Sequence, residues 1–206
     1  MTQAHSKHFT PQEYYDLESL ATYRSDYYRG EIFAMAGGTP RHSLICGNLI
    51  RELGIILKKT PCAVYESNLR LKNKFTGLRN YPDVSVYCGA LEYDEEDSTR
   101  QTVVNPTVLF EVLSPSTEAY DRGFKAQGYR RIESLRAYVL VSQDKAHIEI
   151  FERDDDGSWS LREAAGLETL LGIPPLGIQL PLAEIYARVD FSAPDSEPTA
   201  PRAPHL

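Results

Sequence analysis

The chain has 206 residues, of which 42% are hydrophobic and 25% are charged, an ordinary composition for one globular domain. Its formal net charge of -7 argues against a broadly basic surface that binds nucleic acid by neutralising phosphates alone, but it does not exclude a local site. The N-terminus has no apolar segment of signal-peptide length and no run approaches the roughly 20 apolar residues that span a bilayer, so we expect a soluble, cytoplasmic protein without membrane contact.

The N-terminal elements are predicted to be a short helix and a β-hairpin. Thr10 and Glu13 can form a capping box, which predicts a helix over residues 11–20. Residues 23–36 have the pattern of a hairpin whose turn contains Arg29 and Gly30.

A longer amphipathic helix is predicted over residues 41–59. Apolar residues recur along it at spacings of 4, 4 and 3, which is typical of one buried helix face. These residues are Ile45, Leu49, Leu53 and Ile56. His42 falls on the same face, near the start of the helix.

The rest of the chain is predicted to consist of strands with one central helix. The strands are expected at residues 62–71, 83–87, 107–113, 138–142, 147–152 and 159–163. A helix at residues 118–133 joins the strands on either side of it, an order that predicts a parallel pair. A terminal helix is expected at residues 181–187. We take residues 1–190 as one domain and expect residues 191–206, which contain four prolines, to be a disordered tail.

Neither the cysteines nor the acidic clusters indicate a metal site. Cys46, Cys62 and Cys88 are widely spaced, odd in number and without a CxxC pair. This pattern predicts neither a disulfide framework nor a cysteine zinc site, and it fits a reducing compartment. Residues 92–97, with the sequence EYDEED, are expected to be a solvated loop.

Two carboxylates, Asp83 and Glu111, lie in or beside predicted apolar strands, where a buried charge needs a partner. Glu111 interrupts an almost wholly apolar strand, and Asp83 begins another strand. Burying an ionised carboxylate costs several kcal/mol unless it is paired, hydrogen-bonded or bound to a metal. If the two strands pair antiparallel, Asp83 and Glu111 come together, and their oxygens suit Mg²⁺ or Mn²⁺. Lys125, on the predicted helix, can reach back to hold a phosphate or orient water, with Tyr129 one turn further along.

Three motifs occur together and in order: Pro82-Asp83, then PTVLFEVLSPST from Pro106 to Thr117, then Asp121, Lys125 and Tyr129 at intervals of four. With these motifs the chain resembles the Uma-two family, a branch of the PD-(D/E)XK nuclease superfamily. The likeness covers most of residues 14–151. The superfamily pattern places a lysine two residues after the glutamate, whereas Leu113 stands there, so Lys125 would be a migrated substitute.

The resemblance implies an α/β (α+β) protein with the restriction-endonuclease-like fold, an αβββαβ core whose central mixed sheet is flanked by helices. It also implies metal-dependent phosphodiester hydrolysis, with Asp83 and Glu111 as ligands of Mg²⁺ or Mn²⁺ and Lys125 positioning water or phosphate. Auxiliary candidates are Glu31, His42 and Tyr129. Nucleic acid is the implied partner, DNA by family analogy, and a homodimer would let two sites reach two strands.

Other interpretations stay open at this point. Asp121 and Lys125 have the i to i+4 spacing of an ordinary ion pair on a helix surface. Glu31 fits a surface charge at a strand end, and His42 fits a hydrogen-bonded histidine on a helix face without a functional role. A catalytically inactive module of the same fold that binds nucleic acid or protein is the leading alternative function. A glycoside hydrolase would need Asp83 and Glu111 to face each other across a cleft.

Overall fold

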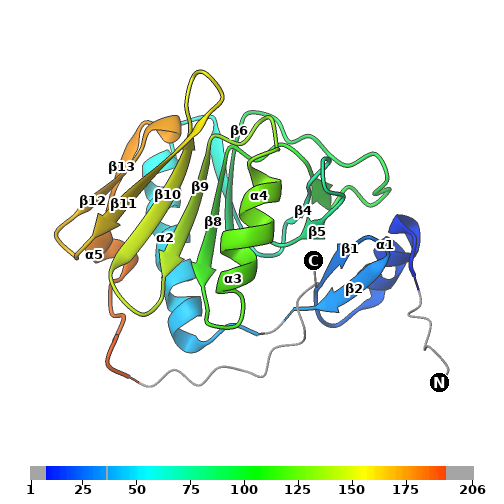
Figure 1. Cartoon of the computed structure of the whole chain (residues 1–206), viewed down its shortest axis with the longest axis horizontal. Coiled ribbons are helices and arrows are strands. Elements are labelled where there is room, and N and C mark those ends of the chain that lie inside the picture. Colours follow the sequence, from blue (N-terminus) through cyan, green and yellow to red (C-terminus); the bar gives the residue numbers. More distant parts are fainter. Residues whose placement is uncertain (1–7, 36, 194–206) are drawn as a thin grey trace.

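A six-stranded mixed sheet forms the centre of the described chain, residues 8–35 and 37–193 of the computed structural model (Figure 1). The strands follow the order β11, β10, β9, β8, β6, β3 across the sheet. Strands β8 and β9 run parallel, as predicted, and the other neighbours are antiparallel. The strands are β3 (Cys62–Glu66), β6 (Val84–Cys88), β8 (Val108–Leu113), β9 (Ala137–Ser142), β10 (His147–Arg153) and β11 (Trp159–Ala165).

The predicted αβββαβ order is present in this sheet and its helices. Helix α2 (Pro40–Leu57) precedes β3, β6 and β8, and a helical segment leads from β8 to β9. The segment consists of α3 (Glu118–Tyr120), the π-helical turn η1 (Asp121–Lys125) and α4 (Ala126–Tyr129). It ends at Tyr129 instead of the predicted Glu133. Figure 1 shows α2 and the α3–α4 segment on opposite faces of the sheet, so helices flank it as predicted.

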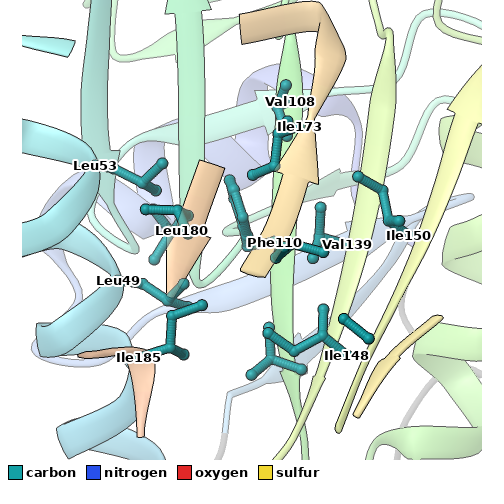
Figure 2. Packing of buried hydrophobic residues seen from close by; sticks show 14 of the residues in the cluster. Leu49, Leu53, Val108, Phe110, Val139, Ile148, Ile150, Ile173, Leu180 and Ile185 are labelled. Atoms are coloured by element: carbon teal, nitrogen blue, oxygen red, sulfur yellow. The ribbon is translucent and has the colours of Figure 1, made fainter. Parts of the chain in front are cut away.

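Strand alternation divides the core into two layers. On β8, Val108, Phe110 and Val112 join the cluster under α2. Leu109 and Leu113 belong to the cluster under α4, so Glu111, between them, is directed to that face. Figure 2 shows the α2 side, where apolar side chains of α2 lie opposite those of β8, β9 and β10. This side forms the larger of the two clusters.

Helix α2 buries a slightly different face from the predicted one. Ile45, Leu49 and Leu53 are fully buried, but the next buried residue is Leu57, while Ile56 is 36% exposed. The spacing of four therefore continues to the end of the helix, and the prediction for Ile56 was wrong. Within the described ranges, no helix is both long and apolar enough to cross a membrane.

The N-terminal hairpin joins three later strands in a smaller, five-stranded sheet beside the central one (Figure 1). Helix α1 (Pro11–Leu20) begins with the predicted capping box between Thr10 and Glu13. The sheet contains β1 (Ser25–Tyr28), β2 (Glu31–Ala34), β4 (Arg70–Lys72), β5 (Arg79–Asn80) and β7 (Thr102–Val103), in the order β2-β1-β5-β4-β7. The strand predicted over residues 62–71 is thus two strands in different sheets, because a turn follows Glu66.

The predicted hairpin of β1 and β2 is confirmed. Its turn residues Arg29 and Gly30 have φ angles of 48° and 88°, as in a two-residue turn with both residues left-handed. Glycine adopts this backbone region without a steric penalty, and Gly30 supplies the second position.

A hairpin that the sequence did not predict covers part of the α2 side. It contains β12 (Leu170–Ile173), the 3-10 turn η2 (Pro174–Leu176) and β13 (Ile178–Pro181), and α5 (Leu182–Ile185) follows. Helix α5 is therefore shorter than the helix expected over residues 181–187. Leu180 and Ile185 pack into the main cluster, and Phe191 packs against it. Residues 194–206 of the expected tail lie outside the described residues.

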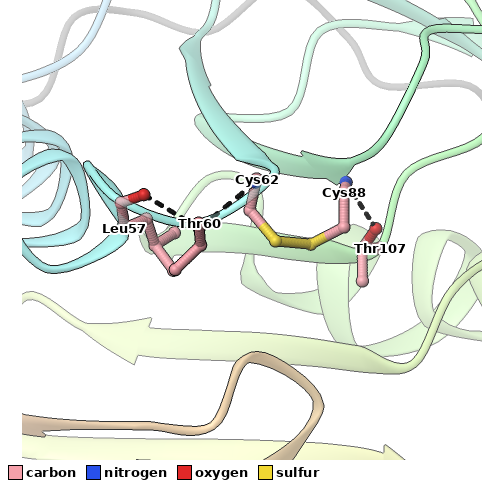
Figure 3. The surroundings of a disulfide bond; sticks show 5 residues. All are labelled: Leu57, Thr60, Cys62, Cys88 and Thr107. Atoms are coloured by element: carbon pink, nitrogen blue, oxygen red, sulfur yellow. Dashed lines mark hydrogen bonds between the residues drawn. A yellow bond between two sulfur atoms is a disulfide. The ribbon is translucent and has the colours of Figure 1, made fainter.

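A disulfide joins Cys62 of β3 to Cys88 of β6 (Figure 3). The two residues are directly opposite in the antiparallel register, with a Cα–Cα distance of 3.9 Å. Flanking hydrogen bonds run from the Cys62 amide to Thr60 and from the Cys88 amide to Thr107. The prediction that no disulfide forms was wrong, because strand register, not sequence spacing, brings these thiols together. The cysteine pattern therefore gives no support for a reducing compartment.

Candidate active site

An open cleft of about 1040 Å³ lies where the small sheet meets the central sheet. Its lining comes from α1, the β1–β2 hairpin, the start of α2, the β3–β4 turn, β8 and the π-helical turn. Asp83, Glu111, Lys125 and His42 all contribute to it. The structure therefore brings four of the predicted site residues to one cavity.

Glu111 is an ionisable group held inside the sheet, with only 2% of its surface exposed. Its Oε1 accepts hydrogen bonds from Lys125 Nζ at 3.0 Å and from Tyr129 Oη at 3.1 Å. Its Oε2 accepts a long hydrogen bond of 3.4 Å from the Asp83 amide. Burial raises the pKa of Glu111 to about 8, with Lys125 opposing the shift and Asp121 and Asp83 adding to it. A further cation beside Glu111 would favour the carboxylate form.

Asp83 lies just before β6, opposite the end of β8, as the predicted antiparallel pairing requires. Its Oδ2 accepts hydrogen bonds from the Val112 amide at 2.7 Å and from His42 Nε2 at 3.1 Å. Burial opposes ionisation of Asp83, but the bond to His42 and its charge hold the pKa of Asp83 below its ordinary value. Conversely, burial opposes protonation of His42, but Asp83 raises the pKa of His42 to about 11. The two side chains form an ion pair at neutral pH.

Lys125 is buried and bridges two carboxylates. Its Nζ lies 2.8 Å from Asp121 Oδ1 and 3.0 Å from Glu111 Oε1. The i to i+4 pair and the reach over the strand were alternatives in the sequence, and the structure contains both. Burial alone would lower the pKa of Lys125, but Asp121 and Glu111 carry it well above its ordinary value. Lys125 is therefore a fixed cation and not a proton acceptor.

Tyr129 supports Glu111 from α4. The Tyr129 side chain is fully buried, and its hydroxyl donates to Glu111 while it accepts a hydrogen bond from Asn80 Nδ2. The π-helical turn lies directly before α4, and π-helical turns are common at functional sites.

The hairpin contributes a carboxylate different from the predicted one. Glu31 is exposed at the turn end of β2 and does not line the cleft. Asp26 of β1 lines it instead, and its Oδ1 is shielded from solvent without a hydrogen-bond partner among the described residues. Burial raises the pKa of Asp26 to about 7, although the charge of Lys125 opposes the shift. Strand alternation is the sequence signal that could have indicated Asp26, because it places Asp26 and Tyr28 on the same face of β1. In the structure Tyr28 packs against Phe124 of η1.

The donor set fits a hard divalent cation. Six carboxylates line the cleft, and four of them, those of Asp26, Asp83, Glu111 and Asp121, interact electrostatically with Lys125. Carboxylate oxygens, including the shielded Oδ1 of Asp26 that has no hydrogen-bond partner among the described residues, are ligands of the kind that Mg²⁺ or Mn²⁺ takes.

A nitrogen and sulfur ligand set lies next to these carboxylates. His42, Cys46 and Asp83 have ligand atoms within 4.8 Å of one another. Burial raises the pKa of the Cys46 thiol, so it stays protonated, and the His42 imidazole is engaged with Asp83. Among the described residues this is the group whose ligand atoms lie closest together, whereas the carboxylates match Mg²⁺ or Mn²⁺ by the type of their ligand atoms.

Comparisons with known proteins identify the family of the chain. The profile of the Uma2 family, described as "Putative restriction endonuclease", matches residues 11–183. Two uncharacterized proteins of Synechocystis sp. (strain ATCC 27184 / PCC 6803 / Kazusa) are 33% and 32% identical over 183 and 166 residues. These matches cover 88% and 81% of this chain and 93% of each relative.

A crystal structure shares the fold. It is described as "a putative nuclease belonging to DUF820" from Anabaena variabilis ATCC 29413, and it matches with a TM-score of 0.66 at 14% identity. The match covers 81% of this chain and 92% of that chain. The restriction-endonuclease-like fold predicted from the sequence is thereby confirmed. Because the family profile spans most of the chain, the protein belongs to the Uma2 family.

Proposed function

We propose that this protein is a metal-dependent endonuclease that hydrolyses phosphodiester bonds in nucleic acid, with DNA as substrate and Mg²⁺ or Mn²⁺ as the ion. The observation that carries the proposal is the contact between Asp83 and Glu111 at the cleft, with Lys125 bound to Glu111. Membership of the Uma2 family supports a nuclease.

In this proposal Asp83 and Glu111 hold the ion. The chemistry that such an ion supplies is activation of water and neutralisation of charge on phosphoryl oxygens. The Val112 amide and His42 fix the Asp83 carboxylate, and Tyr129 fixes that of Glu111. Each ligand is thus oriented by a group on another element, which keeps the oxygens in place before the ion binds.

Lys125 has a different role. Because its pKa lies well above the ordinary value, it is an ammonium throughout the neutral range. It stabilises charge on the phosphate or orients water and does not accept a proton. Leu113, at the position where the superfamily pattern has lysine, is buried in the core cluster under α4.

The glycosidase alternative does not fit this geometry. Asp83 and Glu111 stand on adjacent strand ends, and the Asp83 backbone amide donates a hydrogen bond of 3.4 Å to Glu111 Oε2. Two carboxylates that act on a sugar need to stand on either side of the bond that they cleave.

The test is cleavage of plasmid and single-stranded DNA with Mg²⁺, Mn²⁺ or EDTA, combined with calorimetric titration of Mn²⁺. Asp83→Ala and Glu111→Ala should lose both cleavage and ion binding, because the carboxylates are the ligands. Lys125→Ala should still bind Mn²⁺ while its kcat falls by about 10²–10³ fold, the loss typical of one stabilising group.

Glu31→Ala is the matched control, because it removes an exposed carboxylate outside the cleft. Cleavage retained by Asp83→Ala and Glu111→Ala would refute the assignment. A wild type that binds DNA but neither cleaves it nor binds Mn²⁺ would point to the inactive binding module.

A further inference from the structure

Arg70 is a buried cation that has no carboxylate partner among the described residues. Its side chain is on β4 and lines the cleft, yet only 4% of the residue is exposed. The guanidinium packs on the rings of Tyr14, Tyr15 and Tyr81, with centroid distances of 5.4, 5.1 and 5.6 Å. Its Nε donates to Tyr81 Oη at 3.0 Å, but it forms no ion pair in the part of the chain that the structure describes, and Nη1 has no hydrogen-bond partner there.

The carboxylates around Arg70 are engaged elsewhere. The charge of Asp97 acts on Arg70, but both Asp97 oxygens accept hydrogen bonds from other groups, namely Thr99, Gln101 and Thr102. Glu18 accepts hydrogen bonds from Ser25 and from Tyr81. Arg70 is thus left with only aromatic faces and one hydroxyl, and a buried charge of this kind is costly unless an anion joins it.

Arg24 approaches the same tyrosine from the loop before β1. Its guanidinium carbon lies 5.6 Å from the centroid of the Tyr81 ring, and its Nη1 donates to Ser67 at 3.4 Å. Arg24 also lines the cleft and forms no ion pair within residues 8–35 and 37–193. Two guanidinium groups therefore flank one ring inside a cleft that is otherwise rich in carboxylates.

Tyr81 lines the same cleft as Asp83, the candidate ion ligand. Tyr81 precedes Asp83 by two residues, so their Cα atoms are at most about 7 Å apart. A nucleic-acid strand whose reacting phosphate lies at Asp83 therefore carries its neighbouring phosphates past Arg24 and Arg70.

We propose that Arg24 and Arg70 form a phosphate-binding subsite that anchors the strand beside the phosphate being cleaved. The inference rests on the proposed nuclease function. Guanidinium groups bind phosphate oxygens in pairs and are weakly hydrated, so they suit this task better than lysines. The need for such a subsite follows from charge, since the net charge is -7 and the carboxylates of the cleft repel a strand.

The first measurement is fluorescence anisotropy of a labelled single-stranded oligonucleotide with Ca²⁺ in place of the reactive ions, over a range of salt concentrations. Arg24→Gln should weaken binding about 10-fold and reduce the salt dependence by about one phosphate contact. Arg70→Lys should also weaken binding, because lysine keeps the charge but loses the paired donors. Arg131→Gln is the matched control, an exposed arginine that packs on Phe75 outside the cleft.

Kinetics separate this subsite from the catalytic group. Arg24→Gln should raise KM and leave kcat within about twofold, because the subsite binds the strand equally in the ground state and the transition state. Lys125→Ala should instead lower kcat. Circular dichroism checks that each variant is folded, and the half-buried Arg24 keeps the test open if substitution at Arg70 unfolds the protein.

The outcomes distinguish the subsite from the nuclease function. Suppose that the wild type cleaves, and that folded Arg24→Gln and Arg70→Lys have the same KM, affinity and salt dependence as the wild type. This result would overturn the proposed subsite but not the proposed nuclease function. Binding that depends on both arginines, without cleavage under any ion, would support the subsite and refute the nuclease. If the oligonucleotide does not bind at all, calorimetry with inorganic pyrophosphate decides: binding lost in Arg24→Gln supports the subsite, and no binding overturns it.

Discussion

Asp26 and Glu31 stand on the two strands of one hairpin, yet their surroundings differ. Asp26 and Tyr28 share a face of β1, and Tyr28 packs edge-on against Phe124 of η1 at 4.8 Å. This contact turns Asp26 towards the cleft, where the charge of Lys125 acts on it. Glu31 lies beyond that contact, at the exposed turn. The two side chains have the same chemistry, so their positions relative to the contact between Tyr28 and Phe124 explain why Asp26 lines the cleft and Glu31 does not.

The two carboxylates offer a matched pair of substitutions. Asp26→Asn keeps the shape of the side chain and removes a charge beside Lys125, so we expect single-turnover cleavage to fall at least about 10-fold. Glu31→Gln removes an exposed charge and should leave the rate unchanged. Equal rates for both variants would show that Asp26 has no part in the reaction.

Asp97 ties together the loop that leads from β6 to β7. It is 2% exposed, and it accepts hydrogen bonds from the Thr99 amide and hydroxyl, the Gln101 amide and the Thr102 hydroxyl. The prediction that residues 92–97 are solvated was wrong for Asp94 and Asp97, which are both buried. A run of acidic residues in sequence does not reveal which members find backbone donors after the loop closes.

Substitution of Asp97 should have a pH-dependent effect on stability. Burial opposes its ionisation, but the bonds from Thr102 and Thr99 outweigh burial and lower the pKa of Asp97. A lowered folded pKa contributes stability above the unfolded value of about 3.9, and this contribution is lost as the pH falls through the folded pKa. Asp97→Asn should therefore reduce the free energy of unfolding by about 1–3 kcal/mol at pH 7.

Urea unfolding at pH 7, 5, 4 and 3 measures this difference between wild type and Asp97→Asn. The difference should be constant from pH 7 to pH 5 and should shrink below pH 4. A difference that stays the same at pH 3 would contradict the role of the ionised carboxylate.

The disulfide fastens the edge strand β3 to β6. Cys62 and Cys88 are 26 residues apart, and a cross-link over a loop of this length typically contributes about 2–4 kcal/mol. Cys88→Ser should lower the free energy of unfolding by an amount of this size and shift the urea midpoint down accordingly, and a reducing agent should do the same to the wild type. Cys46→Ser is the control, because Cys46 is the free cysteine among the described residues. Equal midpoints for oxidised and reduced wild type would contradict the cross-link.

The elements that sequence reasoning recovered are those with a local signal. The capping box of Thr10 predicted α1, and the apolar run with a single charge predicted β8. Helix α2 was recovered except for its last turn, where Leu57 replaces Ile56 in the buried face. β12 and β13 were missed because each has four residues and gains its stability from packing on α2 and not from a pattern of its own.

The sequence likewise predicted only part of the candidate site. Asp83 and Glu111 could be paired from strand order alone, and Lys125 from helical spacing and family resemblance. Asp26, Arg24 and Arg70 could not, since they come from the small sheet and the loop before it, and nothing local in the sequence fixes how that sheet meets the central one.

At the scale of the whole molecule, the cleft is lined by residues of both sheets, and the proposed ion ligands Asp83 and Glu111 come from the central one. Any ligand that binds only the folded state stabilises it, by about 2.7 kcal/mol at 100 times its Kd. Mn²⁺ should therefore raise the Tm of the wild type and of Glu31→Ala, but not that of Glu111→Ala. A Tm of Glu111→Ala that rises as much as that of the wild type would place the ion elsewhere.

The lysine beside Glu111 stands on a helix and not on the strand that carries the glutamate. Position 113 is thereby free to hold a leucine, and β8 is apolar along its whole length except at one residue. The position of Lys125 relative to Glu111 then depends on the widened turn of η1. In this turn the Ala126 amide donates a hydrogen bond to the Asp121 carbonyl five residues back. A one-residue deletion within this turn would rewind it to an ordinary helix and rotate Lys125 and Tyr129 together, by about 100°, relative to Asp121 at its start. The position of Lys125 relative to Glu111 is thus set by the helical segment. Single-residue insertions and deletions in that segment change this position and leave the strands of the sheet unchanged.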